Sequence, residues 1–364
     1  MTDNQTSRLH QLFEEHGQSP WLDNLRRGWL HDGEMERWIA SGVRGITSNP
    51  SIFQKAIEGS EEYTEQFDAL AADGVSTEDA YWELVISDIE GALALLRPLY
   101  DESNGLDGFV SVEVDPGLAH DRAGTEAAAR TLWDRIDEPN VYIKIPATVE
   151  GVGAIEEMIA EKRNVNVTLL FSVERYRDVM EAYLRGLERA EGDLSAISSV
   201  ASFFISRVDV AVDAALNEEG SELALSLRGK AAIANGKLAN AAFKEVFSGP
   251  RWEALVARGA QVQRPLWAST GTKDPEYSDT LYVDELIGPD TVNTIPDSTL
   301  ANFIDHGTVS RTLDVAVDDA REVLANVAAL GIDLEEIAGA LEVAGVASFE
   351  KAFDDLLAAL EAQR

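Results

Sequence analysis

Short runs of apolar and β-branched residues alternate along the chain with longer segments in which apolar residues recur every three or four positions. The first pattern is typical of strands and the second of amphipathic helices. On this basis we predict eight strands, at about 19–23, 45–50, 109–116, 141–146, 164–171, 195–205, 264–269 and 291–295. Helical patterns separate consecutive strands, so the strands are expected to pair in parallel through crossover connections.

Eight parallel strands joined by helices are enough to close a barrel, and 364 residues fit one barrel with insertions. We therefore predict an α/β fold, a (β/α)8 TIM barrel with extra N-terminal, C-terminal and inserted helices. No internal repeat or Ser/Pro-rich linker divides the chain, which favours a single domain over residues 1–364. The barrel core would occupy about 19–310 and a C-terminal helical extension about 311–364. The alternative fold is an open, doubly wound sheet whose polar strand ends lie in solvent.

Lys144 stands out because it interrupts a strand that is otherwise largely apolar. Strands buried on both faces are nearly continuous apolar sequence, and lysine is rarely buried unless it is paired. A desolvated ammonium has its pKa lowered, and the neutral amine can attack a carbonyl group to form a Schiff base. The alternative is an edge-strand lysine that points into water. Asn166 and Thr168, on one face of the next strand, favour a polar centre enclosed by an apolar wall.

Polar residues lie at or near the C-terminal ends of all eight predicted strands. They are Asp23, Asn49, Glu113, Lys144, Thr168, Ser202, Ser269 and Asn293. In a barrel these strand ends meet at one mouth, which is the face where enzymes with this fold place their chemistry. The pattern therefore predicts a catalytic site at the C-terminal mouth of the barrel.

Schiff-base chemistry needs one group to move protons at the carbinolamine and another to take a proton beside the bond that breaks. Glu113, sharing a water with Thr168, is the candidate for the first task, and Asp23 is the candidate for the second. Asn49 and Asn166 would bind substrate hydroxyls or hold the lysine in line, because an amide offers both a donor and an acceptor. Taken singly, each carboxylate has an alternative role as a salt-bridge partner or helix cap.

Two segments are predicted to bind phosphate. Ser202 at a strand end is followed by Arg207 at a helix start, and Ser269 and Lys273 repeat this arrangement after the seventh strand. Helix N-termini that carry Arg or Lys bind phosphate through backbone N–H groups and charge-assisted hydrogen bonds. Neither the P-loop spacing nor Gly-x-Gly-x-x-Gly is present, so nucleotide binding is not supported. The five histidines are scattered without metal-ligand spacing, which disfavours a metal-dependent aldolase.

The composition narrows the class of protein further. There are 65 acidic and 30 basic residues, a formal net charge of −35 and a pI near 4.3. This charge repels nucleic acids and anionic membranes, and a phosphorylated substrate would need a local basic cluster. The acidic surface either keeps the protein soluble or adapts it to a salty cytoplasm. There is no cysteine, no signal-peptide pattern and no long apolar segment, so we expect a cytoplasmic protein without disulfides or membrane spans.

Four segments resemble the transaldolase family, and they occur in the family's order. They are GITSNPSIF (45–53), SVEVDP (111–116), YIKIPAT (142–148) and NVNVTLLFS (164–172). The match runs from about Trp21 to Leu300, and the lysine motif and the Asn-x-Thr-Leu-x-Phe-Ser motif are highly specific together. Two later segments, LYVDELIGP (281–289) and TVNTIP (291–296), resemble the longer bacterial subfamily.

This resemblance implies a class I aldolase-like barrel without a metal or organic cofactor. It implies transfer of a dihydroxyacetone unit from sedoheptulose 7-phosphate to glyceraldehyde 3-phosphate, giving erythrose 4-phosphate and fructose 6-phosphate in the pentose phosphate pathway. When the motifs are matched position by position, the resemblance implies that Lys144 is the Schiff-base residue. It also implies that Glu113 and Thr168 form a water-linked relay and that Asp23 is the acid/base for carbon–carbon cleavage. The implied substrate ligands are Asn49, Asn166, Ser202 and Arg207.

The second phosphate segment departs from the family, because many members have an arginine soon after the seventh strand. Lys273 stands in this segment here, and a lysine is a point charge without the bidentate fork of a guanidinium. Two other functions stay open, an aldolase of the fructose 6-phosphate type with the same imine chemistry and a non-catalytic sugar-phosphate binding barrel. A monomer and a homodimer also stay open, because the closing helices could cover the barrel or form an interface.

Overall fold

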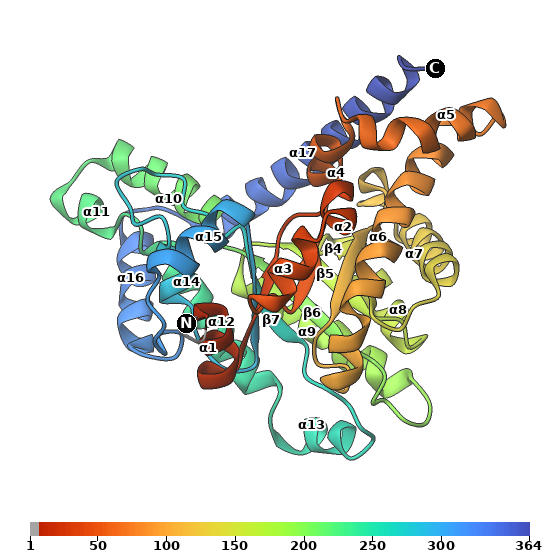
Figure 1. Ribbon diagram of the computed structural model, residues 1–364. Coiled ribbons are helices and arrows are strands. Elements are labelled where there is room, and N and C mark those ends of the chain that lie inside the picture. Colours follow the sequence, from red (N-terminus) through yellow and green to blue (C-terminus); the bar gives the residue numbers. More distant parts are fainter. Residues whose placement is uncertain (1–6) are drawn as a thin grey trace, which may run out of the picture.

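Eight parallel strands form a closed barrel in the computed structural model, which describes residues 7–364 (Figure 1). Consecutive strands are hydrogen-bonded neighbours around the ring, and β8 pairs with β1. The strands are β1 Gln18–Leu22, β2 Gly45–Thr47, β3 Phe109–Glu113, β4 Val141–Pro146, β5 Val165–Leu170, β6 Ser199–Phe204, β7 Arg264–Ala268 and β8 Thr291–Ile295. The predicted (β/α)8 barrel is confirmed, and the open-sheet alternative is wrong.

Helices surround the barrel, because parallel neighbours can be joined only by crossover connections. Most of the helices lie outside the ring of strands, and Figure 1 shows α6, α7 and α8 on one side of it. The helices are α1 Arg8–His16, α2 Arg27–His31, α3 Glu34–Ala40, α4 Pro50–Ile57, α5 Thr64–Ala72, α6 Thr77–Glu102, α7 Arg122–Ile136, α8 Val149–Ala160, α9 Val173–Arg189, α10 Ser206–Glu219, α11 Glu222–Leu227, α12 Ala231–Val246, α13 Gly249–Val256, α14 Leu281–Glu285, α15 Asp297–His306, α16 Val317–Ala329 and α17 Leu334–Glu361, with 3-10 turns at Glu61–Tyr63 and Pro116–Leu118. None of the helices between residues 7 and 364 has both the length and the apolar character that crossing a membrane requires.

The strands are buried along their whole length, including their polar residues. At the N-terminal end of the barrel a buried ion cluster fills the interior, with Asp107 3.1 Å from Arg264 and 2.6 Å from Arg44. Burial alone would raise the pKa of Asp107, but the two guanidinium groups outweigh it and hold the pKa below its usual range. This paired cluster closes the bottom of the barrel, opposite the C-terminal mouth.

Two of the predicted elements have different boundaries in the structure. Pro50 was expected to end the second strand, but it begins α4, and the Asn49 side chain caps this helix by accepting a hydrogen bond from the Ile52 N–H. Proline is well suited to a first helical position, because its missing N–H would have no partner there. The pattern of apolar residues over 222–247 predicts one helix, but the structure has two, α11 and α12, with a break at residues 228–230. Gly229 at this break has φ +70°, which a continuous helix does not allow.

Helix α17 packs across the C-terminal end of the barrel and contacts α4, α6, α10 and β5. Figure 1 shows it as a long helix that reaches from the barrel towards α4 and α5. The helix approaches β5 closely at Gly345, where a Cβ atom would lie 2.9 Å from Leu169 Cδ2. Leu169 itself has φ +59°, at the point where the register between β5 and β6 shifts. The second closing helix therefore covers the barrel mouth.

Candidate active site at the mouth of the barrel

Lys144 lies inside the barrel on β4 and is 4% exposed. Its ammonium donates a hydrogen bond to the Ser48 carbonyl oxygen at 3.1 Å and lies 3.4 Å from Glu113 Oε2. The parallel register sets Glu113 of β3, Lys144 of β4 and Asn166 of β5 side by side. The edge-strand alternative is therefore wrong, because this amine is enclosed by polar groups of the neighbouring strands.

Glu113 and Thr168 both keep an oxygen without a hydrogen-bond partner among residues 7–364. Glu113 Oε2 faces the Lys144 ammonium at 3.4 Å, so its remaining interaction is an ion pair. Thr168 Oγ1 has no such partner, and a buried polar atom without a partner is costly. Burial raises the pKa of the Glu113 carboxyl, and the nearby Lys144 and Arg207 charges oppose this shift only in part. Glu113 is therefore a carboxyl that can hold a proton more readily than an exposed glutamate.

Asp23 follows β1 and supplies the second carboxylate of the mouth. Thr47 Oγ1 donates a hydrogen bond to Asp23 Oδ1 at 2.7 Å and lies 2.5 Å from the Thr294 hydroxyl. Burial raises the pKa of Asp23, while Lys144 and the Thr47 hydrogen bond lower it in part. Thr47 and Thr294 were not among the predicted site residues, because threonine is common in any strand.

The two amides of the site are held in different ways. Asn166 donates to Ser111 Oγ at 2.9 Å and accepts from Ser202 Oγ at 2.7 Å, so its orientation is determined by the barrel interior. Asn49 uses its carbonyl oxygen to cap α4 and also lines the mouth. Ser202 also lines the mouth. The predicted hydroxyl ligands are thus fixed by contacts that the strands and α4 provide.

Two cations at the mouth have no carboxylate partner among the described residues. Arg207, at the start of α10, lies 5.1 Å from the centre of the Phe204 ring and 5.8 Å from that of Phe349. Burial lowers the pKa of Arg207, and the carboxylates of the site oppose this shift only in part. Lys273 is exposed on the segment after β7, on which Ser269 has φ +56°. A guanidinium held between two rings without a counter-ion is well placed for a phosphate group.

A cavity of 120 Å³ joins these groups. Seven of the predicted site residues line it, namely Asp23, Asn49, Lys144, Ser202, Arg207, Ser269 and Lys273. Glu113, Asn166 and Thr168 do not line it; Glu113 lies beside Lys144, and Asn166 is hydrogen-bonded to Ser202. The strand-end residue Asn293 is held inside the barrel, where its Oδ1 accepts from Thr270. The other lining residues, which were not predicted site residues, are Thr47, Phe204, Ala268, Gly271, Thr294, Pro296 and Phe349.

The fold and the site define a (β/α)8 barrel whose C-terminal mouth encloses a buried amine beside two carboxyl groups. A model of the Transaldolase/Fructose-6-phosphate aldolase family matches residues 20–360, and the chain belongs to this family. Among similar proteins, Transaldolase 1 of Streptomyces avermitilis is 51% identical over 362 residues, which are 98% of this chain and 96% of that protein.

Two further relatives agree in name and extent. Transaldolase of Saccharopolyspora erythraea is 50% identical over 368 residues, which cover 100% of this chain and 99% of the relative. Transaldolase of Thermobifida fusca is 50% identical over 356 residues, which cover 96% of both chains. The family resemblance seen in a few short segments is thus confirmed over nearly the whole length of the chain.

Proposed function

We propose that this chain is a transaldolase that moves a dihydroxyacetone unit from sedoheptulose 7-phosphate to glyceraldehyde 3-phosphate. The products are erythrose 4-phosphate and fructose 6-phosphate. The observation that carries the proposal is the Lys144 amine, which is buried 3.4 Å from the Glu113 carboxyl at a mouth that also holds Asp23. Membership of the Transaldolase/Fructose-6-phosphate aldolase family supports it. The proposal includes a cytoplasmic location, because its substrates are phosphorylated metabolites.

The first half of the reaction forms the imine. Lys144 first gives a proton to Glu113, and the neutral Nζ then attacks the ketone carbon C2 of the donor. Glu113 returns this proton through Thr168 and a shared water to the carbinolamine hydroxyl, which leaves as water. Burial raises the pKa of Glu113, and Thr168 Oγ1 has no hydrogen-bond partner among residues 7–364, which supports these roles. A carboxyl whose pKa is raised by burial is a better proton donor near neutral pH than an exposed one.

The second half breaks and remakes a carbon–carbon bond. Asp23 takes the proton of the C4 hydroxyl, the C3–C4 bond breaks, and its electron pair moves into the iminium to leave an enamine on Lys144. The aldose leaves, and the enamine attacks the aldehyde carbon of the acceptor, whose oxygen takes the proton back from Asp23. Water then hydrolyses the new imine and frees Lys144 and the ketose. The raised pKa of Asp23 suits a group that must both accept and return a proton.

The phosphate of each substrate is bound at the far end of the same cavity. Arg207 and Lys273 neutralise its charge. Ser269, on the same segment as Lys273, lies 2.8 Å from the hydroxyl of Ser206 at the start of α10. Asn49, Asn166 and Ser202 bind or orient the donor hydroxyls near Lys144. This arrangement uses cations that have no ion-pair partner among residues 7–364, so phosphate binding breaks no existing salt bridge.

Borohydride trapping tests the central step. Fructose 6-phosphate and sodium borohydride should reduce the imine to a stable secondary amine, and mass mapping should find the adduct on Lys144. The Lys144→Met variant is the matched control, because it removes the amine but keeps a chain of similar length, and it should show no adduct. Labelling of any of the other seven lysines in place of Lys144 would overturn the assignment.

A fructose 6-phosphate aldolase is the second candidate, since the family description includes it. The two reactions share the enamine and differ in whether it is transferred to an aldose or protonated and hydrolysed to free dihydroxyacetone. Product analysis with fructose 6-phosphate, with and without erythrose 4-phosphate, separates them. We expect sedoheptulose 7-phosphate to form with the acceptor and little free dihydroxyacetone without it.

A further inference from the structure

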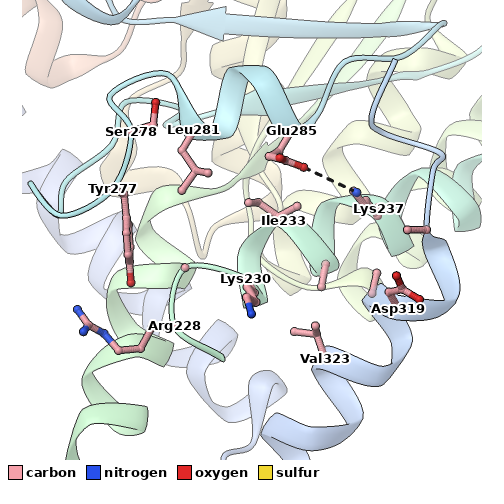
Figure 2. A pocket seen from close by; sticks show the side chains of 14 residues that line it. Arg228, Lys230, Ile233, Lys237, Tyr277, Ser278, Leu281, Glu285, Asp319 and Val323 are labelled. Atoms are coloured by element: carbon pink, nitrogen blue, oxygen red, sulfur yellow. Dashed lines mark ion pairs between the residues drawn. The ribbon is translucent and has the colours of Figure 1, made fainter. Parts of the chain in front are cut away.

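The two C-terminal helices pack against the barrel in different ways. Helix α16 leaves a groove of 490 Å³ beside α12 and α14, and Figure 2 shows Ile233 and Val323 on different walls of this space. Helix α17 instead touches β5 directly, because a Cβ atom at Gly345 would lie 2.9 Å from Leu169 Cδ2. Carbon atoms in contact are usually about 3.5–4.0 Å apart, so the helix can approach this closely only at a glycine. The contact lies on the strand that carries Thr168, a residue of the proposed relay.

Leu169 has an unusual backbone conformation for a strand residue. Its φ is +59°, and among residues 7–364 it is the only residue inside a strand with a positive φ. This left-handed conformation is unfavourable for a leucine, because the Cβ atom comes too close to the following carbonyl oxygen. The side chain is 1% exposed and is confined by Gly345, so it has little room to relax. The contact with α17 therefore holds the strained conformation in place.

The left-handed residue lies in a β-bulge between β5 and β6. The register runs from the pair Val167–Ala201 to the pair Leu170–Phe203, which leaves two residues of β5 opposite one residue of β6. In a regular strand Leu170 would face the barrel interior, as the polar residues two and four positions before it do. In the bulged strand it is level with Phe203, which packs on Tyr176 of α9 with ring centres 6.0 Å apart. The bulge therefore keeps an apolar side chain out of the catalytic mouth.

The same bulge determines how Thr168 is held. On the β4 side, Thr168 is in register with Pro146, and its carbonyl oxygen accepts a hydrogen bond from the Ala147 N–H at 2.8 Å. On the β6 side, Thr168 has no register partner, because the bulge begins there. The Thr168 hydroxyl has no hydrogen-bond partner among residues 7–364 that would fix it. The free side of Thr168 is thus held through Leu169, whose side chain Gly345 confines.

We propose that Leu169 and Gly345 are positioning residues, whose contact holds Thr168 in place while the carbinolamine on Lys144 loses water. This inference rests on the proposed function, in which Thr168 passes a proton in that step. Leu169 and Gly345 do not line the catalytic cavity, so they act through the backbone of Thr168 and not on the substrate. The helix that covers the mouth therefore also completes the relay beneath it.

Two single substitutions disturb the contact from opposite sides. Gly345→Ala adds a methyl group against Leu169, whereas Leu169→Ala removes the contact but keeps a residue other than glycine at the left-handed position. Each should slow imine formation with fructose 6-phosphate about fivefold to tenfold, because a small displacement of a proton-transfer group is costly. Quenching with sodium borohydride at short times, followed by mass mapping of Lys144, measures this rate.

Gly339→Ala is the matched control for Gly345→Ala. It makes the same change on the same helix, but no packing neighbour lies within 4 Å of the added methyl group. We expect its rate of imine formation to equal that of the wild type. Circular dichroism should confirm that all the variants are folded. If Leu169→Ala does not fold, Gly345→Ala decides the test, because it adds a good helix former and removes nothing from the core. Wild-type rates in the folded contact variants would overturn the proposal.

A double-mutant cycle with Thr168→Val distinguishes positioning from general damage. Thr168→Val keeps the shape of the side chain, removes its hydroxyl and should slow imine formation about 10²-fold. If the contact acts through Thr168, adding Gly345→Ala to this variant should slow the step by less than about twofold more. An equal loss in both backgrounds would overturn the proposal.

The KM for fructose 6-phosphate gives a second readout. It should stay within about twofold of the wild type in Gly345→Ala, because the proposed role belongs to a chemical step. A raised KM with an unchanged rate of imine formation would overturn the proposal, since the contact would then position Arg207, whose Nη1 lies 3.6 Å from the same Cβ position. A wild type that forms no adduct on Lys144 would refute the proposed function itself. A wild type that forms the adduct no faster than the contact variants would overturn this inference alone.

Discussion

At the scale of single residues, the two carboxyl groups of the site, Glu113 and Asp23, have different surroundings. Glu113 lies 3.4 Å from the Lys144 ammonium, whereas Asp23 accepts a hydrogen bond from the Thr47 hydroxyl at 2.7 Å. Burial is the main cause of the raised pKa of both groups. Because their hydrogen-bond partners differ, they can serve different proton transfers in one reaction.

Glu113→Gln should separate catalysis from binding. We expect kcat to fall by about 10²- to 10⁴-fold, the usual contribution of a general acid, with the donor KM within a few-fold of the wild type. Glutamine has the same shape but cannot release a proton. Steady-state kinetics with fructose 6-phosphate and erythrose 4-phosphate measures both constants. Glu342→Gln is the control, because burial also raises the pKa of that carboxyl, outside the catalytic cavity; an unchanged kcat in Glu113→Gln would remove Glu113 from the relay.

Lys144 could be predicted from the sequence because a lysine inside an apolar strand contradicts the pattern around it. Asp23, Asn49, Ser202 and Ser269 could be placed at the mouth because a barrel brings strand C-termini together. The same rule did not show that Glu113, Thr168 and Asn293 lie outside the lining of its cavity. Thr47 and Thr294 could not be found in this way, since threonine favours strands whether or not its hydroxyl is used. Their hydroxyl contact joins β2 and β8, which lie on opposite sides of β1 around the barrel, and it depends on the curvature of the closed sheet.

At the scale of elements, α17 shows what a periodic pattern does and does not determine. Its amphipathic sequence predicted a helix from about 333, and the structure has one over Leu334–Glu361. The pattern did not indicate which surface the helix covers. That surface is selected by shape. Gly345 allows α17 to approach Leu169 closely, and the centre of the Phe349 ring lies 5.8 Å from the Arg207 guanidinium. Such contacts between distant segments carry no local sequence signal.

Phe349→Leu should weaken phosphate binding without changing the chemistry. The variant keeps an apolar side chain of α17 but loses the cation–π contact with Arg207, which is worth about 1 kcal/mol, or roughly fivefold in KM for a phosphorylated donor. kcat should stay within twofold. Kinetics with fructose 6-phosphate and with unphosphorylated fructose distinguishes the two effects, because only the first should change. Val343→Leu, at a position of α17 that is 65% exposed, is the control; equal losses with both sugars would show general damage to the mouth instead.

The contact between α10 and α12 predicts that the stability of the folded state depends on pH. Asp209 of α10 accepts a hydrogen bond from the Ala232 N–H at the start of α12, and burial raises the pKa of Asp209 to about 6. The folded state thus binds this proton more tightly than the unfolded state, so stability from this group falls as pH rises from about 4 to about 6. Above about pH 6, the ionised Asp209 carboxylate lowers the free energy of unfolding by about 3 kcal/mol.

Asp209→Asn should remove this penalty, because asparagine keeps the acceptor oxygen but carries no charge. We expect the free energy of unfolding of the variant to exceed that of the wild type at pH 8, and the difference to be about 1 kcal/mol smaller at pH 5. Urea denaturation at the two pH values measures it. Asp68→Asn, an exposed position on α5, should show no such pH dependence. A difference that grows towards low pH would contradict the assigned cause.

At the scale of the whole molecule, charge is the dominant feature outside the site. Exposed arginines pair with acids, as Arg251 does with Glu181 and Glu188 at 2.7 Å, but acidic residues exceed basic ones by 35. Exposed ion pairs contribute about 0–1 kcal/mol each, and salt weakens them. Repulsion among the unpaired acids opposes folding, and salt relieves it. Salt therefore lowers stability by weakening the ion pairs and raises it by relieving the repulsion. Because acidic residues are in excess, relief of the repulsion is the larger effect.

We therefore expect the melting temperature to rise with KCl, on the order of 5 °C between 0.05 M and 1 M, which is a few kcal/mol for a chain of this size. The Debye length falls from about 10 Å at 0.1 M to about 3 Å at 1 M, so most of the rise should come at low salt if screening is the cause. NaCl at the same ionic strength is the control and should give the same curve. A flat or falling curve would rule out adaptation to a salty cytoplasm, and the acidic surface would then serve solubility alone. A rise that continues beyond the range where screening is complete, in KCl but not in NaCl, would indicate specific binding of potassium by the acidic surface, because non-specific salt effects should be nearly the same for the two chlorides.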